Sequence, residues 1–302
     1  MLALAMTLDA LIGEPRVLWS RVPHPVVAIG RLINWLERRL NRGTARRGKG
    51  VLALGVVLMA VLPLPLLLWW LPYAWPLEVL GAAILLAHRS LVQHVGDVAQ
   101  GLSVSLEEGR ARVAMIVGRD PNRLDQSGVA RAAIESAAEN FSDGVVAPAF
   151  WFAVAGLPGI AVYKAVNTAD SMIGYLSPRF SEFGWASARL DDALNLIPAR
   201  LTGALFCVVG LRRAAWRIMW QDAGLHRSPN AGWPEAALAG SLDLAIAGRR
   251  VYPDRVVDDP YLNEEGRHDI GPADIERAIQ LLWRAWGLML ALAFVSVAWL
   301  VL

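Results

Sequence analysis

The sequence predicts an all-α protein, a polytopic integral membrane helical bundle with broken or re-entrant helices and a cytoplasmic flap. Two observations favour this fold class. Hydrophobic residues occupy 55% of the 302 positions and charged residues only 19%, against about 25% charged residues in an average soluble domain. Several charge-free stretches also approach the roughly 20 apolar residues that a spanning helix needs. We therefore expect residues 1–302 to form a single membrane-embedded domain.

Residues 51–87 are predicted to form a helical hairpin in the membrane. No charge occurs from position 51 until Glu78, and this stretch is too long for one spanning helix. The turn is predicted at the two prolines of the run LPYAWP. Pro63 and Pro65 are expected to kink the first arm, because proline lacks the backbone N–H that a helix interior needs.

Residues 144–211 are predicted to form a core of broken helices. The charge-free stretch 144–163 is interrupted by Pro148 and by the run GLPG, and the stretch 193–211 carries Arg200 within it. Irregular backbone at membrane depth is tolerated where it lines a cavity. We therefore expect both stretches to be broken or re-entrant helices beside a cavity.

The last third of the chain is predicted to contain a flap followed by a membrane helix. Residues 222–280 are rich in Gly, Pro and acidic side chains, which favours a polar region outside the bilayer. Residues 285–302 carry no charge and predict a plain C-terminal membrane helix.

Loop charges predict the orientation of the chain. Residues 31–50 carry six arginines and one lysine against the single acid Glu37, which marks this segment as cytoplasmic. A full crossing at 144–163 would carry Lys164 and the arginines after it to the outside, so the positive-inside rule favours re-entrant helices there.

Charge and cysteine content exclude several other classes of protein. The formal net charge is +2, so no strong field selects a polyanion, and we expect no nucleic-acid partner. The single cysteine, Cys207, excludes a disulfide framework and a cysteine-based zinc site. It lies in the apolar run LFCVVGL, which favours a packed core residue. The N-terminus lacks the basic start of a secretory signal, so we expect no cleaved leader.

A dense polar set flanks the two interrupted stretches. It comprises Glu135, Glu139, Asn140, Asp143, Lys164, Asn167, Asp170, Asp191, Asp192, Asn195 and Arg200. Such groups are costly at membrane depth unless they bind cations or one another. Carboxylate and amide oxygens suit Mg²⁺, which usually takes one or two carboxylates plus substrate phosphates, and Lys164 and Arg200 can neutralise phosphate. The alternative is a set of salt bridges between packed helices, such as Asp170 with Lys164.

Two shorter motifs are also candidates for a site. Prolines on both sides of His24 hold its imidazole on a stiff extended turn, where the ring serves either chemistry or structure. Ser228 and Asn230 precede a glycine in an arrangement that resembles an anion-binding helix N-terminus. The alternative is that both are turn or cap residues.

The run GTARRGKG at residues 43–50 matches a phosphate-binding loop only in part. Gly50 stands where a serine or threonine should bind Mg²⁺. The run also follows an apparent helix instead of a strand, so we interpret it as a cytoplasmic polybasic loop.

Three long segments resemble the adenosylcobinamide-phosphate synthase family of cobalamin biosynthesis. They read ESAAENFSDGVVAPAFWFAVAGLPGIAVYKAVNTADSMIGY, FGWASARLDDALNLIPARLTG and HRSPNAGWPEAALAGSL. The opening LDALIGEPRVLWSRVPHPVVAIGRLINWLERRLN is similar to the start of that family, so the resemblance covers nearly the whole chain. We transfer nothing from the run GRRVYPDRVVDDPYLNEEGRHDI, which is variable in character.

The resemblance implies an enzyme, a membrane-bound ATP-dependent carboxylate–amine ligase in which residues 1–302 form one catalytic domain. It would join the free propionate of adenosylcobyric acid to the amine of (R)-1-aminopropan-2-ol or its O-phosphate, through an acyl phosphate, to give adenosylcobinamide or its phosphate. ATP and Mg²⁺ are the implied cofactors. The implied partners are the corrinoid, the amino alcohol and the lipid bilayer, with a second copy of the chain or other cobalamin-pathway enzymes as candidates. The active site would face the cytoplasm from the cell (inner) membrane.

Under this resemblance every residue of the polar set except Asn195 receives a role. The Mg²⁺ ligands would be Glu135, Asp143, Asp170, Asp191 and Asp192. Lys164 and Arg200 would hold phosphate, Asn140 and Asn167 would orient the substrates, Glu139 or His24 would be the base, and Ser228 and Asn230 would hold the phosphate of the amino alcohol. Trp151, Trp185 and Trp233 are candidates for stacking on the corrin, or alternatively for interfacial anchoring.

Two other functions fit parts of the sequence. A membrane prenyl-transferase-like enzyme also holds Mg²⁺ and diphosphate on Asp-rich helices, which Asn167 to Asp170 and the pair Asp191 and Asp192 mimic in part. A non-catalytic inner-membrane regulatory or scaffold protein is the other alternative, and the many polar residues near the interrupted helices argue against it.

Overall fold

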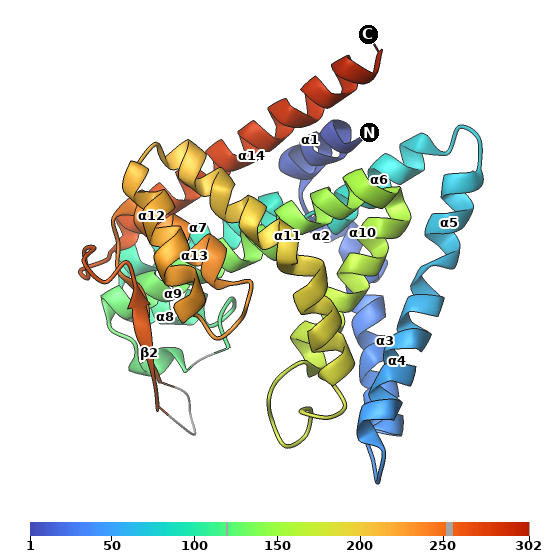
Figure 1. The fold of residues 1–302 in the computed structure, drawn as a ribbon, viewed down its shortest axis with the longest axis horizontal. Coiled ribbons are helices and arrows are strands. Elements are labelled where there is room, and N and C mark those ends of the chain that lie inside the picture. Colours follow the sequence, from blue (N-terminus) through green and yellow to red (C-terminus); the bar gives the residue numbers. More distant parts are fainter. Residues whose placement is uncertain (119, 252–255, 302) are drawn as a thin grey trace. The chain divides into compact units, whose positions relative to one another are not determined.

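The residues that the structure describes fold mainly into α-helices, with one small two-stranded sheet (Figure 1). The computed structural model describes residues 1–118, 120–251 and 256–301. The chain divides into two compact units, each built from two separate stretches of sequence. Unit 1 is Met1–Ala87 with Ala147–Asn195, and unit 2 is His88–Val146 with Leu196–Leu302. The predicted all-α class is confirmed, and the two units are described in turn.

Unit 1 contains the N-terminal helices and the two helices that carry half of the predicted site. Its elements are α1 (Leu2–Ile12), α2 (Arg16–Trp19), α3 (Pro25–Leu40), α4 (Arg46–Val61), α5 (Pro63–Trp70), α6 (Trp75–Leu85), α10 (Ala147–Ile173) and the first part of α11 (Trp185–Gly210). Ile29, Ile33 and Leu36 form one apolar face of α3, at the spacing of a helix that buries one side. That face packs with buried side chains of α4 and α10 in a single core.

Residues 51–87 form two helical arms joined by a turn in unit 1, and their placement in a membrane stays a prediction. The first arm is α4 followed by α5, and the second arm is α6. Helix assignment is interrupted only at Leu62, directly before Pro63, and Leu62 keeps helical dihedrals (φ −68°, ψ −35°). Residues 71–74, which include the first proline of LPYAWP, form the turn between the arms (Figure 1).

Gly50 lets α4 approach the segment that joins α10 to α11. A Cβ atom built on Gly50 would lie 1.9 Å from the carbonyl oxygen of Phe183. No other residue fits this contact without moving the backbone, so the segment is held against the start of α4.

The break predicted in 144–163 is confirmed in α10. Ala155 (φ −138°, ψ 22°) and Gly156 (φ 60°, ψ −153°) leave the helical conformation, and Pro158 follows them. α11, by contrast, runs without a break through Pro198, so the interruption predicted in 193–211 is not found. Pro198 leaves the carbonyl of Leu194 without its helical donor, and the indole N–H of Trp151 donates to that oxygen at 3.1 Å.

Unit 2 packs around the alanine-rich helix α9. Its elements are α7 (His88–Val104), α8 (Leu106–Val113), the 3₁₀ turn η1 (Pro121–Arg123), α9 (Gln126–Phe141), the π turn η2 (Ser142–Val146), the end of α11, α12 (Arg213–Asp222), the 3₁₀ turn η3 (Ala223–Leu225), α13 (Gly232–Leu242), β1 (Ile246–Val251), β2 (Val256–Leu262) and α14 (Pro272–Val301). α9 is buried along nearly its whole length, because its alanines allow close approach on every side.

The segment predicted as a flap contains structure that the sequence did not indicate. β1 and β2 pair antiparallel from Ile246 opposite Leu262, with an irregularity between Ala247 and Arg249. Helix α13 precedes them and is buried at every position except Trp233. Positions 252–255 of the predicted flap and position 302 of the predicted C-terminal helix lie outside the described residues.

Five helical stretches among the described residues, some of which join consecutive labelled helices, are long and apolar enough to cross a membrane. They are Arg46–Trp70, Trp75–Val104, Gln126–Ile173, Trp185–Gly210 and Pro272–Val295. These lengths and compositions are those of a multi-pass membrane protein. The orientation and the re-entrant course of 144–163 stay predictions.

Candidate functional site

A continuous line of hydrogen bonds joins α10 to α11 in unit 1. The hydroxyl of Tyr163 donates to Asn195 Oδ1 at 3.0 Å, and Asn195 Nδ2 donates to Asp191 Oδ2 at 2.9 Å. Asn167 Nδ2 donates to the other carboxylate oxygen of Asp191 at 3.2 Å. We call these four residues the α10–α11 polar chain. Tyr163, Asn195 and Asp191 are buried, so the line lies inside the packed helices.

The spacing of the residues creates this line. Tyr163 and Asn167 are one turn apart on α10, and Asp191 and Asn195 are one turn apart on α11. Each helix therefore presents two polar groups on one face, and the carboxylate of Asp191 accepts from both helices. The arrangement fixes one buried carboxylate by two amide donors, one from each helix.

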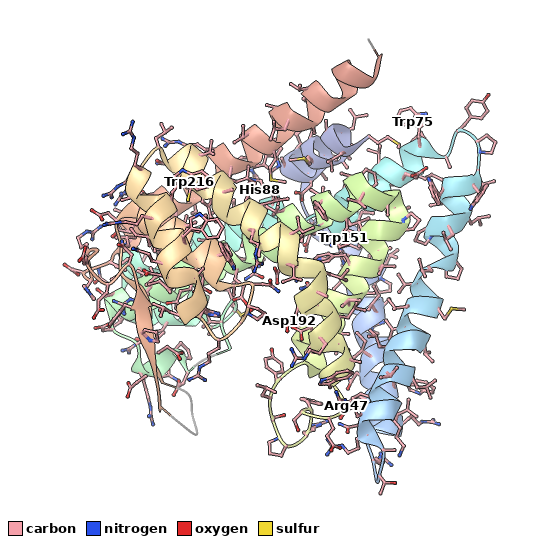
Figure 2. All side chains as sticks on the ribbon, in the orientation of Figure 1. Arg47, Trp75, His88, Trp151, Asp192 and Trp216 are labelled. Atoms are coloured by element: carbon pink, nitrogen blue, oxygen red, sulfur yellow. The ribbon has the colours of Figure 1, made fainter. Side chains whose placement is uncertain are left out.

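Three more predicted residues lie on the same two helices and are half-buried. Lys164 and Asp170 belong to α10, and Asp192 belongs to α11, where Figure 2 labels it. Asp170 fills the space beside Gly174, since a Cβ atom on that glycine would lie 1.9 Å from Asp170 Oδ1. Of the predicted site residues, unit 1 thus brings one cation and three carboxylates onto α10 and α11.

His24 is held by the backbone at both of its ring nitrogens. Nδ1 accepts from the N–H of Val26 at 3.2 Å and caps α3, and Nε2 lies 3.2 Å from the carbonyl oxygen of Ile84. Burial lowers the pKa of the His24 imidazole below its usual value. Since Nδ1 accepts a hydrogen bond, Nε2 carries the proton that faces the carbonyl of Ile84, and the imidazole acts as a helix cap in this structure.

The predicted residues of α9 and η2 belong to unit 2. Glu135 is buried, and its Oε1 accepts from the N–H of Ala247 at 3.0 Å, which ties α9 to β1. Asn140 donates to the carbonyl and hydroxyl oxygens of Ser136 at 2.9 and 3.0 Å. Glu139 is exposed, and Asp143 lies in the π turn directly after α9. Single π turns inside helical stretches occur frequently at functional sites.

The remaining predicted residues meet near the start of α13. Arg200 Nη1 lies 3.4 Å from Asn230 Oδ1, and its guanidinium stands over the ring of Trp233 at 4.5 Å. Ser228 Oγ accepts from the N–H groups of Asn230 and Ala231, each at 3.2 Å. Ser228 therefore caps the turn before α13, as its alternative reading predicted.

The structure does not gather the five predicted metal ligands into one cluster within the described residues. There, no group of three or more His, Cys, Asp or Glu side chains lies close enough to hold a metal ion. Three of the five acids, Asp170, Asp191 and Asp192, belong to unit 1, and the other two belong to unit 2. The Mg²⁺ assignment stays a prediction.

Sequence reasoning missed one member of the polar chain. Tyr163 closes the apolar stretch before Lys164 and was treated as part of it. Its position four residues before Asn167 was the available signal, since residues four apart on a helix share a face. Asn195 was noted in the polar set without a role, and the structure places it between Tyr163 and Asp191.

Comparison with known proteins identifies the family. A family model described as CobD/Cbib protein matches residues 2–282. The chain belongs to the CobD/Cbib protein family. The cobalamin biosynthesis protein CobD of Rhodobacter capsulatus is 50% identical over 99% of this chain and 98% of its own length. That of Brucella suis is 49% identical over 98% of this chain and 95% of its own length. No solved structure gives a significant match.

CobD/Cbib membership confirms the resemblance seen in the sequence. It gives this chain a role in cobalamin biosynthesis, carried out by a protein with helices of membrane-spanning length. Every predicted site residue, from His24 to Asn230, lies inside the matched range.

Proposed function

We propose that the protein is an ATP-dependent ligase that forms an amide on a corrinoid. The bond would join the free propionate of adenosylcobyric acid to (R)-1-aminopropan-2-ol or its O-phosphate. The α10–α11 polar chain is the observation that carries this proposal. A buried carboxylate held by two amides in helices of spanning length is costly, and such groups mark substrate or ion sites.

The chemistry requires activation of an unreactive carboxylate. Transfer of the γ-phosphoryl group of ATP to a propionate oxygen would give an acyl phosphate and ADP. The amine nitrogen would then attack the acyl carbon, the C–O bond to phosphate would break, and the nitrogen would lose a proton. A site for this reaction must exclude water from the acyl phosphate, and packed apolar helices serve that purpose.

In unit 1, Asp191 and Asp192 supply carboxylates, and Lys164 supplies a cation for phosphate. With no larger group of acids among the described residues, Mg²⁺ would take one or two carboxylates and fill its other positions with phosphate oxygens and water. That donor set is common for Mg²⁺. The ion would neutralise the charge of the transferring phosphoryl group. Asn167 would orient Asp191 and one substrate.

In unit 2, Arg200 is the candidate for a second phosphate contact. Its guanidinium stands over Trp233 and beside Asn230, and a phosphate would replace the weak 3.4 Å contact with a charge-assisted one. Glu139 is the better candidate for the base, because it is exposed at the end of α9, whereas His24 serves as the cap of α3.

Substrate-dependent release of ADP tests the proposal. Purified full-length protein in nanodiscs should form ADP only when adenosylcobyric acid and the amine are both present, and mass spectrometry should find the amide product. A chelator should abolish both. Corrinoid binding without any ADP would contradict the ligase and favour a scaffold, while turnover of an allylic diphosphate would favour a prenyl transferase.

A further inference from the structure

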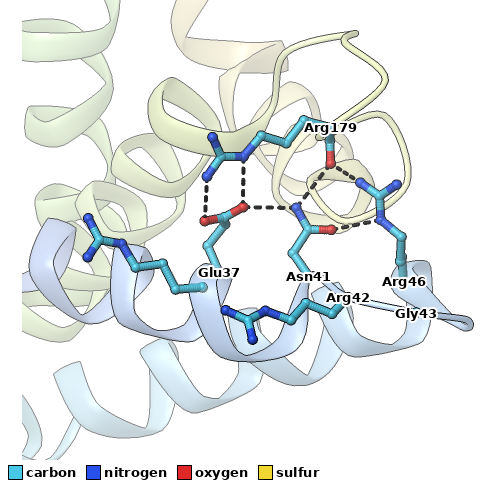
Figure 3. A pocket seen from close by; sticks show the side chains of 7 residues that line it. Glu37, Asn41, Arg42, Gly43, Arg46 and Arg179 are labelled. Carbon is cyan, nitrogen blue, oxygen red and sulfur yellow. Dashed lines mark hydrogen bonds and ion pairs between the residues drawn. The ribbon is translucent and has the colours of Figure 1, made fainter.

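A strongly basic pocket lies at the loop end of the α3–α4 helix pair in unit 1 (Figure 3). Its volume is about 450 Å³. Among the described residues that line it, the only acid is Glu37, and four are arginines: Arg38, Arg42, Arg46 and Arg179. We call it the arginine pocket. It includes part of the run GTARRGKG, whose chemistry the proposed ligase reaction does not use.

Arg179, Arg46, Glu37 and Asn41 form a hydrogen-bonded network, which we call the frame of the pocket. Arg179 Nε and Nη2 donate to the two carboxylate oxygens of Glu37 at 3.0 and 2.9 Å. Asn41 donates to Glu37 and to the Arg179 carbonyl, each at 3.0 Å. Arg46 donates to Asn41 Oδ1 at 2.7 Å and to the carbonyl oxygens of Pro178 and Arg179. The ion pair with Arg179 thus neutralises the negative charge of Glu37.

The other two arginines have their charge available for a ligand. Arg38 and Arg42 are exposed and lie one turn apart on α3 and the loop after it. Neither guanidinium makes a hydrogen bond or ion pair with any residue that the structure describes, and in Figure 3 no contact reaches that of Arg42. A pocket with two free guanidinium groups and a neutralised acid favours an anion, and guanidinium pairs suit phosphate oxygens.

The place of the pocket on the chain identifies the source of the phosphate. A candidate membrane span begins at Arg46, which is itself part of the pocket wall. Trp35 and Trp185 are 52% and 38% exposed, with Arg39 and Arg47 stacked over their rings at 5.1 and 3.5 Å. Exposed tryptophans beside arginines are typical of the membrane interface. If the span that begins at Arg46 crosses a bilayer, the pocket lies at its edge, at the level of the phospholipid headgroups.

We infer that the arginine pocket binds the phosphate group of an anionic phospholipid. Basic pockets beside spanning helices bind such headgroups. A free phosphate or a nucleotide shares this chemistry, but the exposed tryptophans and the adjoining span favour a ligand anchored in the bilayer. The pocket contains no member of the α10–α11 polar chain. This inference is therefore independent of the proposed ligase activity, and either can be wrong without the other.

Native mass spectrometry of the full chain in detergent tests the inference. Dioleoylphosphatidylglycerol should bind more tightly than dioleoylphosphatidylcholine. The double variant Arg38→Gln/Arg42→Gln should weaken phosphatidylglycerol binding roughly 30-fold. Arg213→Gln/Arg217→Gln on α12, an exposed pair of the same spacing and charge, should leave binding within about twofold. Equal binding of both lipids, or unchanged binding by the first variant, overturns the inference.

Competition separates the two sources of phosphate. Inorganic phosphate and ATP should not displace the lipid. If either displaces it, and is itself lost in Arg38→Gln/Arg42→Gln, the pocket is a site for a soluble phosphate compound and the lipid assignment is wrong. The variant Arg38→Lys/Arg42→Lys keeps both charges and should retain most of the lipid affinity, which separates loss of charge from loss of fold.

Discussion

At the scale of single residues, Asp191 is the most constrained acid of the candidate site. Its two carboxylate oxygens accept from Asn167 and Asn195, and it is buried. Asp191→Asn would place an NH₂ group against one of these amide donors. We expect turnover to fall roughly 100-fold, since a shift of about 1 Å in a catalytic group has that effect. Substrate-dependent ADP formation measures it.

A matched substitution controls for the change of charge. Asp97 is exposed on α7, and Asp97→Asn should keep wild-type turnover. Equal turnover by wild type and Asp191→Asn, with both proteins inserted in the membrane, would remove Asp191 from the site.

Glu37 gives a second prediction at this scale, about pH. Hydrogen bonds from Arg179 hold the pKa of the Glu37 carboxyl below its usual 4.5. A lowered pKa in the folded state means that ionised Glu37 stabilises the protein above pH 4.5, and that this contribution is lost as the pH falls through the lowered pKa. Glu37→Gln should therefore lower the unfolding temperature at pH 7, and the difference from wild type should shrink toward pH 3.

The exposed acid Glu107 on α8 provides the comparison for Glu37. Glu107→Gln should match wild type at both pH values in the same thermal unfolding experiment. A Glu37→Gln variant as stable as wild type at pH 7 would show that the pair with Arg179 contributes nothing.

At the scale of elements, the break in α10 depends on one glycine. Gly156 has φ 60° and ψ −153°. A residue with a Cβ atom adopts this backbone conformation at a cost of about 1–3 kcal/mol. Gly156→Ala should lower the free energy of unfolding by that amount. Gly55→Ala, at an exposed helical position with no neighbour within 4 Å, should be neutral or slightly stabilising. Denaturant unfolding in detergent compares them, and equal stability would show that the break tolerates a side chain.

The sequence was informative about elements wherever local chemistry decides the structure. Proline runs and charge-free length predicted the hairpin 51–87, and the run GLPG predicted the break in α10. The same reasoning failed for α11. A proline removes the N–H that would bond to the carbonyl four residues earlier, and the helix can continue when another group donates to that carbonyl. For Leu194 the donor is Trp151, which lies more than 40 residues away in the chain. The strands β1 and β2 were missed because they pair mainly with each other and carry charged residues.

At the scale of the whole molecule, the hairpin makes a prediction about topology. Residues in the loop before α4 and in the turn before α6 should label from opposite sides of the membrane. Cys207 is buried and free, so Thr44→Cys and Tyr73→Cys, both at exposed positions, can be compared with the unmodified chain. An impermeant maleimide should reach Tyr73→Cys from outside, and Thr44→Cys only after the membrane is opened. Labelling of both from one side would contradict a spanning hairpin.

The sequence also predicted the membrane class and the family of the whole molecule, but not its two units. The sequence predicts a single polar cluster, which stays a prediction: the contacts within each unit place part of the set on α10 and α11 and part around α9 and α13. Such a division depends on contacts between distant stretches, and periodicity and composition along one chain carry little information about them.

Because each unit is made from two stretches, synthesis of the chain sets an order for folding. Ile33 and Val57 share their core with Ala165 and Val166, which leave the ribosome much later. At about 5–20 residues per second, the 108 residues between positions 87 and 195 take roughly 5–20 s to make. Through that interval α3 and α4 lack the part of their core that α10 supplies. A nascent chain that stalls before residue 195 leaves both units incomplete. Slow translation between these positions should therefore increase degradation of the new protein more than an equal delay near the C-terminus.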